Sequence, residues 1–196
     1  MIRIYEIPFS TNVERVSLAL AHKGLEAEAV TMDAADRSEI QRVSGQDLVP
    51  VLDHDGRIVV DSPVILAYLE EHFPEPPLYP ADPARRAEVE TFVDWFNLVW
   101  KRWPNEINDG VADRSRELAA SRDRFEAMLD GREHLMGDFG VADCVAFPFL
   151  KYGLLPPAAD DPDSFHLVLA EHLRLGDGYP RLREWIRRVD ERPRAL

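Results

Sequence analysis

A strand–turn–strand–helix pattern beginning at residue 49 constrains the fold more than any other part of the sequence. Val49-Pro50-Val51-Leu52 reads as a strand that starts where the missing N–H of proline is tolerated. His54-Asp55-Gly56 supplies turn residues, and Ile58-Val59-Val60 is a β-branched run typical of a second strand. Asp61-Ser62-Pro63 then has the composition of a helix N-terminus. A carboxylate and a hydroxyl beside free backbone N–H groups make a candidate polar site.

The residues before this pattern predict a βαβ unit. An apolar strand is expected over residues 2–7, followed from Val13 by apolar residues at helical spacing that end at Lys23-Gly24. A second strand, parallel to the first, is expected over residues 27–31, and a short helix over residues 36–43.

A proline-rich segment divides the chain. Residues 74–80 contain four prolines in seven positions, which is typical of a stiff linker. We expect one domain over residues 1–76, a linker over 77–82 and an all-helical domain over 83–196. The helices expected after the linker cover residues 82–103, closed by Pro104, and residues 114–129, 141–154, 165–173 and 182–189.

Composition excludes several classes of function. A formal net charge of -13 over 196 residues argues against nucleic acid or an anionic membrane surface as the main partner. No apolar run approaches the length of a membrane span, and the N-terminus has no signal-peptide pattern. The single Cys144 excludes an internal disulfide and favours a reducing, cytoplasmic setting. The scattered histidines have no metal-ligand spacing, so we expect no metal.

Several ordered motifs are similar to those of the cytosolic glutathione transferases. They are Val49-Pro50-Val51-Leu52, the Asp61-Ser62 pair before a helix, Phe73-Pro74 with Leu78-Tyr79-Pro80, and the weaker Gly140-Val141-Ala142-Asp143. The resemblance implies a thioredoxin-like N-terminal domain of order βαβαββα, an all-α C-terminal domain and pairing as a homodimer. Gly140 stands where the family has Ser or Thr, so Asp143 keeps only half of a helix capping box.

The resemblance also implies roles in binding glutathione. A cis peptide bond would precede Pro50, and the Val49 backbone would pair with the extended thiol peptide as an added strand. Ser62 and the helix N-terminus would take the carboxylate of the γ-glutamyl end, and Asp61 would approach its ammonium. Simple helix capping is the alternative for Asp61 and Ser62.

The loop before Val49 departs from the pattern of the family, which usually reads Asn-Pro-x-Gly at this place. Here the loop is Ser44-Gly45-Gln46-Asp47. Gln46 could still reach the glycine end of the thiol peptide, but the acidic Asp47 would repel a carboxylate.

The group that activates the thiol is expected just before the first helix. Ser10 occupies the place of the serine or cysteine that contacts the thiol in the family. Its hydroxyl would donate to the sulfur and favour the thiolate, aided by the helix N-terminus. Capping of that helix is the alternative. Asn12 is the second candidate. Tyr5 is not a candidate, because it lies within the expected strand, several residues before the turn.

An aromatic segment over residues 91–103 is the expected source of an acceptor pocket. In the family this helix faces the cleft, so Trp100, Trp103 and Phe9 would line a site for a small hydrophobic electrophile. Core packing and dimer contact are the alternatives for each ring.

The resemblance therefore implies a cytoplasmic detoxification enzyme, a glutathione transferase with glutathione as co-substrate and no other cofactor. A transferase that uses another small thiol, and a non-catalytic binding module on the same fold, are the alternatives. Disulfide reduction is disfavoured, because it normally needs a cysteine where Ser10 stands.

Overall fold

The computed structural model describes residues 1–196, and the chain divides between Tyr79 and Pro80 into two compact units. The first unit comprises residues 1–79 together with 193–196, and the second comprises residues 80–192. The last four residues were expected in the helical domain and belong instead to the first unit. They are held there by a long-range contact with α1. The backbone N–H groups of Ala195 and Leu196 each donate to the Ser17 hydroxyl over 3.0 Å.

The first unit is built on a four-stranded mixed sheet of order β2-β1-β3-β4. Its strands are β1 (Ile2–Glu6), β2 (Glu28–Thr31), β3 (Val51–His54) and β4 (Arg57–Val60). β1 and β2 are parallel, whereas β1–β3 and β3–β4 are antiparallel. The expected βαβ unit and the following hairpin are confirmed.

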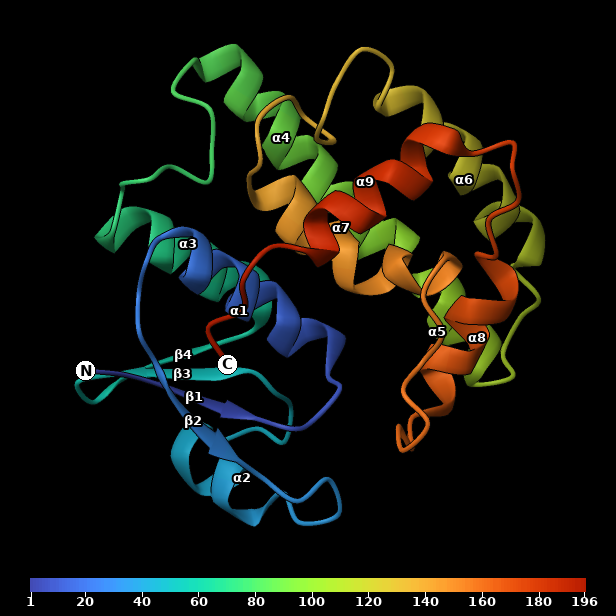
Figure 1. The fold of residues 1–196 in the computed structure, drawn as a ribbon. Coiled ribbons are helices and arrows are strands. Elements are labelled where there is room, and N and C mark those ends of the chain that lie inside the picture. The colour runs from blue at the N-terminus through green and yellow to red at the C-terminus, as the bar shows by residue number, and fades with distance from the viewer. The chain divides into compact units, whose positions relative to one another are not determined.

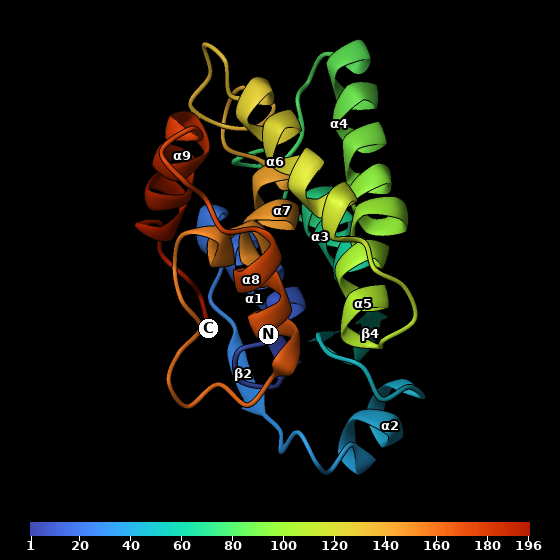
Figure 2. The same cartoon turned by 90° about the vertical axis from the view of Figure 1, so that its right-hand side faces the viewer.

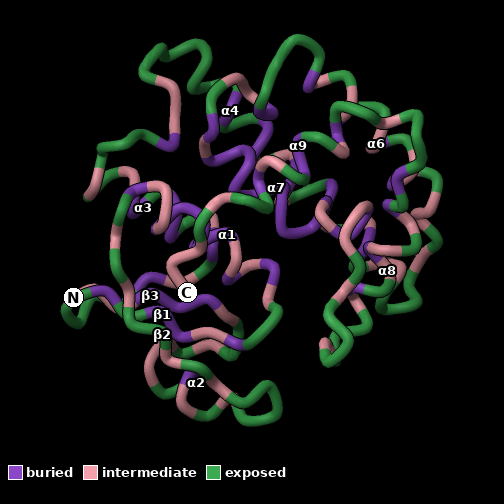
Figure 3. Tube along the Cα trace, viewed as in Figure 1, coloured by how far each residue is buried: buried purple, intermediate pink, exposed green.

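Three helices complete this unit: α1 (Thr11–His22), α2 (Ser38–Ser44) and α3 (Ser62–His72). Figure 1 shows α1 and α3 on one side of the sheet and α2 on the other. Buried residues run along β1, β3, α1 and α3 in Figure 3, which places one part of the core between the sheet and these two helices. A second buried cluster of Tyr5, Ile7, Ile40 and Val51 includes a residue of α2. This order of elements is the thioredoxin-like arrangement expected from the sequence.

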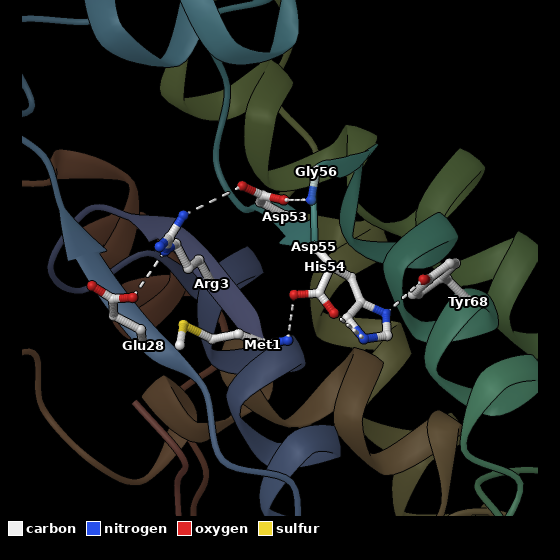
Figure 4. Close-up of polar contacts among 8 residues, drawn as sticks. All are labelled: Met1, Arg3, Glu28, Asp53, His54, Asp55, Gly56 and Tyr68. Carbon is white, nitrogen blue, oxygen red and sulfur yellow. Dashed lines mark hydrogen bonds and ion pairs between the residues drawn. The ribbon is translucent and has the colours of Figure 1, made fainter.

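The hairpin turn has the chemistry that its residues predict. Asp55 and Gly56 have φ values of 52° and 90°, as a two-residue type I′ loop requires. The Gly56 N–H donates to the Asp53 carboxylate over 2.7 Å, and the His54 ring contacts the Tyr68 hydroxyl over 2.8 Å (Figure 4). The turn is therefore tied to α3 by a side-chain contact.

The proline-rich segment is held to the first unit by a buried lysine. The Nζ of Lys23 donates to Glu70 over 2.8 Å and to the backbone carbonyls of Phe73 and Pro76 over 2.6 and 3.0 Å. Glu70 also accepts from the backbone N–H of Leu78 over 2.9 Å. These bonds join the ends of α1 and α3 to the start of the linker.

The second unit is entirely helical apart from its loops. Its helices are α4 (Pro83–Trp95), a π-helical segment (Phe96–Trp100), α5 (Arg102–Asn108), α6 (Ser115–Met128), α7 (Val141–Leu150), a 3-10 turn (Lys151–Gly153), α8 (Ser164–His172) and α9 (Pro180–Asp190). Every residue of α7 is buried, and this helix contacts α4, α8 and α9 (Figure 2). The apolar α7 is therefore the core of the unit. No helix in the chain combines the length and the apolar character needed to cross a bilayer.

One expected helix boundary is wrong. Pro104 does not close a helix that starts at Pro83, because it is the third residue of α5. Proline is tolerated there, since the first-turn N–H groups have no intrahelical acceptor. The preceding π turn, in which the Lys101 N–H donates to the Phe96 carbonyl over 2.9 Å, lets the chain restart as α5.

The expected half of a capping box is present at the start of α7. The Gly140 N–H donates to the Asp143 carboxylate over 3.1 Å, which is the half of the capping box that the sequence retains. Asp143 also accepts from the Trp185 indole over 2.7 Å, so it acts as a folding residue. Cys144 is fully buried in the same helix.

Candidate functional site

The sheet register brings three predicted segments to one end of the first unit. Val51, at the start of β3, pairs with Tyr5 near the end of β1 and with Val60 at the end of β4. Three segments therefore lie at the same end of the sheet: the turn after β1, the loop before β3 and the start of α3. These segments carry Ser10, Val49 and Ser62, which are far apart in the sequence.

Ser10 is the N-cap of α1. Its Oγ accepts from the Val13 N–H over 3.4 Å, so the capping alternative describes a contact that is present. This contact uses a lone pair of the oxygen and leaves the hydroxyl proton to be donated elsewhere. Capping and donation to a bound sulfur are therefore compatible roles for the half-buried Ser10.

Phe9, the residue before Ser10, exposes an apolar ring. It has a positive φ of 65°, which is uncommon for a bulky residue, and its side chain is exposed. The turn before α1 therefore holds the ring of Phe9 at the surface of the unit.

A hydrogen-bonded trio joins α1 to α3. The Nη1 of Arg15 donates to the Oγ of Ser62 over 3.3 Å, and the Ser62 hydroxyl donates to Oδ1 of Asn12 over 3.5 Å. Arg15 and Ser62 are buried, and Asn12 is half-buried. The structure therefore brings together two predicted residues, Asn12 and Ser62, through contacts that the sequence did not indicate.

Asp61 occupies the N-cap position of α3 but does not cap it. Its φ and ψ are 72° and 125°, and its carboxylate makes no capping hydrogen bond. The expectation that Asp61 caps the helix is therefore wrong, because this backbone conformation does not direct the carboxylate to the first-turn N–H groups. A non-glycine residue with positive φ stores about 1–3 kcal/mol of strain, and such residues cluster at binding sites. The carboxylate of Asp61 is exposed.

The peptide bond between Val49 and Pro50 is cis, as the resemblance implied. Val49 is half-buried and lies outside the β ladder, which begins at Val51. Its backbone stands at the sheet end where an extended peptide could add.

The side chain of Gln46 is hydrogen-bonded within its own loop. Its side-chain amide donates to the Leu48 carbonyl over 2.7 Å and accepts from the Leu48 N–H over 3.2 Å. Contact with the glycine end of a thiol peptide would require Gln46 to exchange these partners. The neighbouring Asp47 is exposed.

The two tryptophans expected in an acceptor pocket, Trp100 and Trp103, pack against other aromatic rings of the helical unit. Trp100 is fully buried and stacks on Phe96 with ring centroids 4.4 Å apart. Trp103 is half-buried and lies edge-on to Trp95 at 6.3 Å. Core packing, the alternative for each ring, accounts for Trp100. No group of three or more His, Cys, Asp or Glu side chains is placed to hold a metal ion.

Arg15 is the residue of this region to which sequence reasoning assigned no role. An arginine among the buried residues of an amphipathic helix was the available signal, because a buried guanidinium needs hydrogen-bond acceptors. The partner, Ser62, is 47 positions away and could not be read from spacing.

Comparison with known proteins shows what the chain is similar to in sequence and fold. The glutathione S-transferase N-terminal domain family matches residues 4–77. A solved glutathione S-transferase from Rhodospirillum rubrum F11 is 27% identical, with a TM-score of 0.76 over 98% of this chain and 89% of that one. Glutathione transferase omega-1 of Caenorhabditis elegans is 30% identical over 76% of this chain. The chain is similar to glutathione S-transferases over nearly its whole length, and residues 4–77 match the N-terminal domain of that family.

Rice glutathione S-transferase GST1, solved in complex with glutathione, is 25% identical, with a TM-score of 0.78 over 97% of this chain and 86% of that one. The chain spans 62% of the length of the C. elegans relative. The glutathione S-transferase fold, with its thioredoxin-like and helical units, is thus shared across the whole described chain.

Proposed function

We propose that this protein binds glutathione and joins it, through its sulfur, to a small hydrophobic electrophile. The observation that carries the proposal is the meeting of Ser10, Val49 and the Asp61-Ser62 pair at one end of the sheet, set by the register of β1, β3 and β4. Each group offers a different part of the tripeptide a matching contact.

In this proposal the tripeptide lies along the loop before β3. The Val49 backbone pairs with its cysteinyl residue as an added strand. The start of α3 receives the γ-glutamyl carboxylate, because first-turn N–H groups favour an anion. The Asp61 carboxylate, which does not cap the helix, pairs with the γ-glutamyl ammonium. Gln46 reaches the glycine end after releasing Leu48.

Ser10 then activates the thiol. Its hydroxyl donates a hydrogen bond to the sulfur and the N-terminus of α1 adds a positive potential, so both favour the thiolate. The thiol proton passes to water. The thiolate attacks an electrophilic carbon, a carbon–sulfur bond forms, and the electron pair leaves with the departing group. Asn12 is the second candidate for the donor, although its Oδ1 already accepts from Ser62.

The electrophile meets an apolar surface at Phe9, the exposed ring beside Ser10. Such a surface selects poorly hydrated compounds, in keeping with a role in detoxification. No metal or redox cofactor enters the reaction, because thiolate stabilisation and proximity suffice for substitution at an activated carbon.

We further propose that the protein works in the cytoplasm as a homodimer. The lone Cys144 is a buried free thiol, which suits a reducing compartment. Ile58 and Val64 expose apolar side chains on β4 and α3, and Leu98 and Val99 do so on the π segment. In the dimer that we propose, the second chain covers these groups.

Calorimetric titration with glutathione tests the proposal. Saturable binding is expected, with weaker binding of free cysteine and of cysteinylglycine, which lack the γ-glutamyl group. Conjugation of glutathione to an activated aryl halide should follow. Tight binding of another thiol in place of glutathione would favour the alternative transferase. Binding without conjugation of any electrophile would favour a non-catalytic module.

A further inference from the structure

Arg15 is a fully buried charge in the first half of α1. Its side chain reaches α3, where Nη1 lies 3.3 Å from the Oγ of Ser62. Ser62 is the first residue of α3 and is the residue proposed to meet the γ-glutamyl carboxylate. The guanidinium therefore acts on a group of the binding site without facing the solvent.

The hydrogen bond from Arg15 determines what the Ser62 hydroxyl can do. Because a guanidinium only donates, the Ser62 oxygen must accept from it and turn its own proton elsewhere. That proton now points to Oδ1 of Asn12, 3.5 Å away, which is a long contact. An anionic oxygen is a stronger acceptor than a neutral amide, so a carboxylate at the start of α3 would attract the same proton.

The charge of Arg15 adds to this effect. In a buried setting a cation is screened less than at the surface, so it acts over a few ångströms on an anion near Ser62. The start of α3 also lacks a capping carboxylate, because the Asp61 side chain does not bond to it. The potential there is therefore positive from the helix and from Arg15 together.

We propose that Arg15 is a positioning residue for the γ-glutamyl carboxylate of glutathione: it orients the Ser62 hydroxyl as a donor and supplies buried positive charge behind it. This inference rests on the proposed function. It also predicts that the effect of Arg15 depends on the ligand, and is seen only with a peptide that carries this carboxylate.

Calorimetry with two peptides tests this dependence. The first is glutathione, and the second is γ-aminobutyryl-cysteinyl-glycine, which lacks only the γ-glutamyl α-carboxylate. Arg15→Gln should weaken glutathione binding about 10- to 100-fold, the range for a hydrogen bond to a charged group, and weaken the analogue less than about threefold. In turnover the KM for glutathione should rise while kcat changes little. Arg15→Lys should recover part of the affinity.

The matched control is Arg42→Gln, which removes an exposed arginine from α2 and should leave both affinities unchanged. Equal weakening of both peptides by Arg15→Gln, or no weakening, would overturn the inference. If Arg15→Gln does not fold by circular dichroism, Arg15→Lys decides: selective weakening of glutathione supports the role and equal weakening contradicts it. Absence of saturable glutathione binding by the unmodified protein would instead overturn the proposed function.

Discussion

The ammonium of Lys23 lies 2.8 Å from the carboxylate of Glu70, and the lysine side chain is completely buried. The pair joins the C-terminal ends of α1 and α3, and Glu70 extends the connection to the backbone of the proline-rich segment. Because neither charge is well hydrated, each depends on the other for compensation.

Removing one member of this pair should strongly destabilise the protein. Glu70→Ala leaves a buried ammonium with only carbonyl acceptors, so we expect the free energy of unfolding to fall by about 3–5 kcal/mol. Urea unfolding measures the change. The control is Glu90→Ala, which removes an exposed i,i+4 pair with Arg86 and should cost no more than about 0.5 kcal/mol. If both variants lost the same free energy of unfolding, the buried pair would contribute no more to stability than the exposed pair.

Two substitutions of Ser10 separate capping from thiol activation. Ser10→Asp keeps a capping oxygen for the Val13 N–H but has no hydroxyl proton, and its charge opposes a thiolate. Ser10→Thr keeps both the oxygen and the proton. We expect the aspartate variant to retain stability and lose at least about 100-fold in kcat/KM, because a lost transition-state donor has this magnitude. The threonine variant should keep measurable activity. Full activity of Ser10→Asp would exclude the hydroxyl and direct attention to Asn12.

Replacing Asp61 by glycine should raise the stability of the protein but weaken its binding of glutathione. Asp61→Gly removes the strain of a non-glycine residue at φ 72° and should raise the free energy of unfolding by about 1 kcal/mol. The same change removes the carboxylate proposed for the γ-glutamyl ammonium, so glutathione affinity should fall about tenfold. Asp61→Asn is the matched variant, since asparagine tolerates positive φ without the charge. It should weaken binding with little change in stability. Thermal unfolding and calorimetry together check both effects.

Acid should destabilise the contact between α5 and the start of α6. The hydrogen bond from Arg114 lowers the pKa of Glu106 below its usual 4.5, and the charges of Arg114 and Arg102 act in the same direction. A carboxylate with a lowered folded pKa stabilises the protein above its unfolded pKa, and this contribution is lost as the pH falls below about 4.5 through the folded pKa. Glu106→Gln should therefore lose less Tm than the unmodified protein between pH 6 and 3. Glu88→Gln, at an exposed site on α4, should follow the unmodified protein.

Local sequence was sufficient for the elements whose signals are short-range. Apolar runs, turn residues and proline positions predict β3, the Asp55-Gly56 turn, β4 and the start of α3 to within a residue or two. The motifs that carry the family resemblance lie in the same region, so the fold and the cis peptide bond before Pro50 were predicted as well. Where a tertiary contact or an unusual helical turn intervened, as at Pro104, the same reasoning placed a boundary wrongly.

The sequence by itself determined the residue types at the proposed thiol site and the end of the sheet at which they lie. Only the tertiary structure decided how those groups act on each other. Ser62 meets Arg15, the tail residues Ala195 and Leu196 return to Ser17, and Asp61 turns away from the helix that it precedes. The physical reason is that hydrogen bonds between residues 47 or 178 positions apart depend on how helices pack on the sheet, and periodicity along the chain carries no information about that packing.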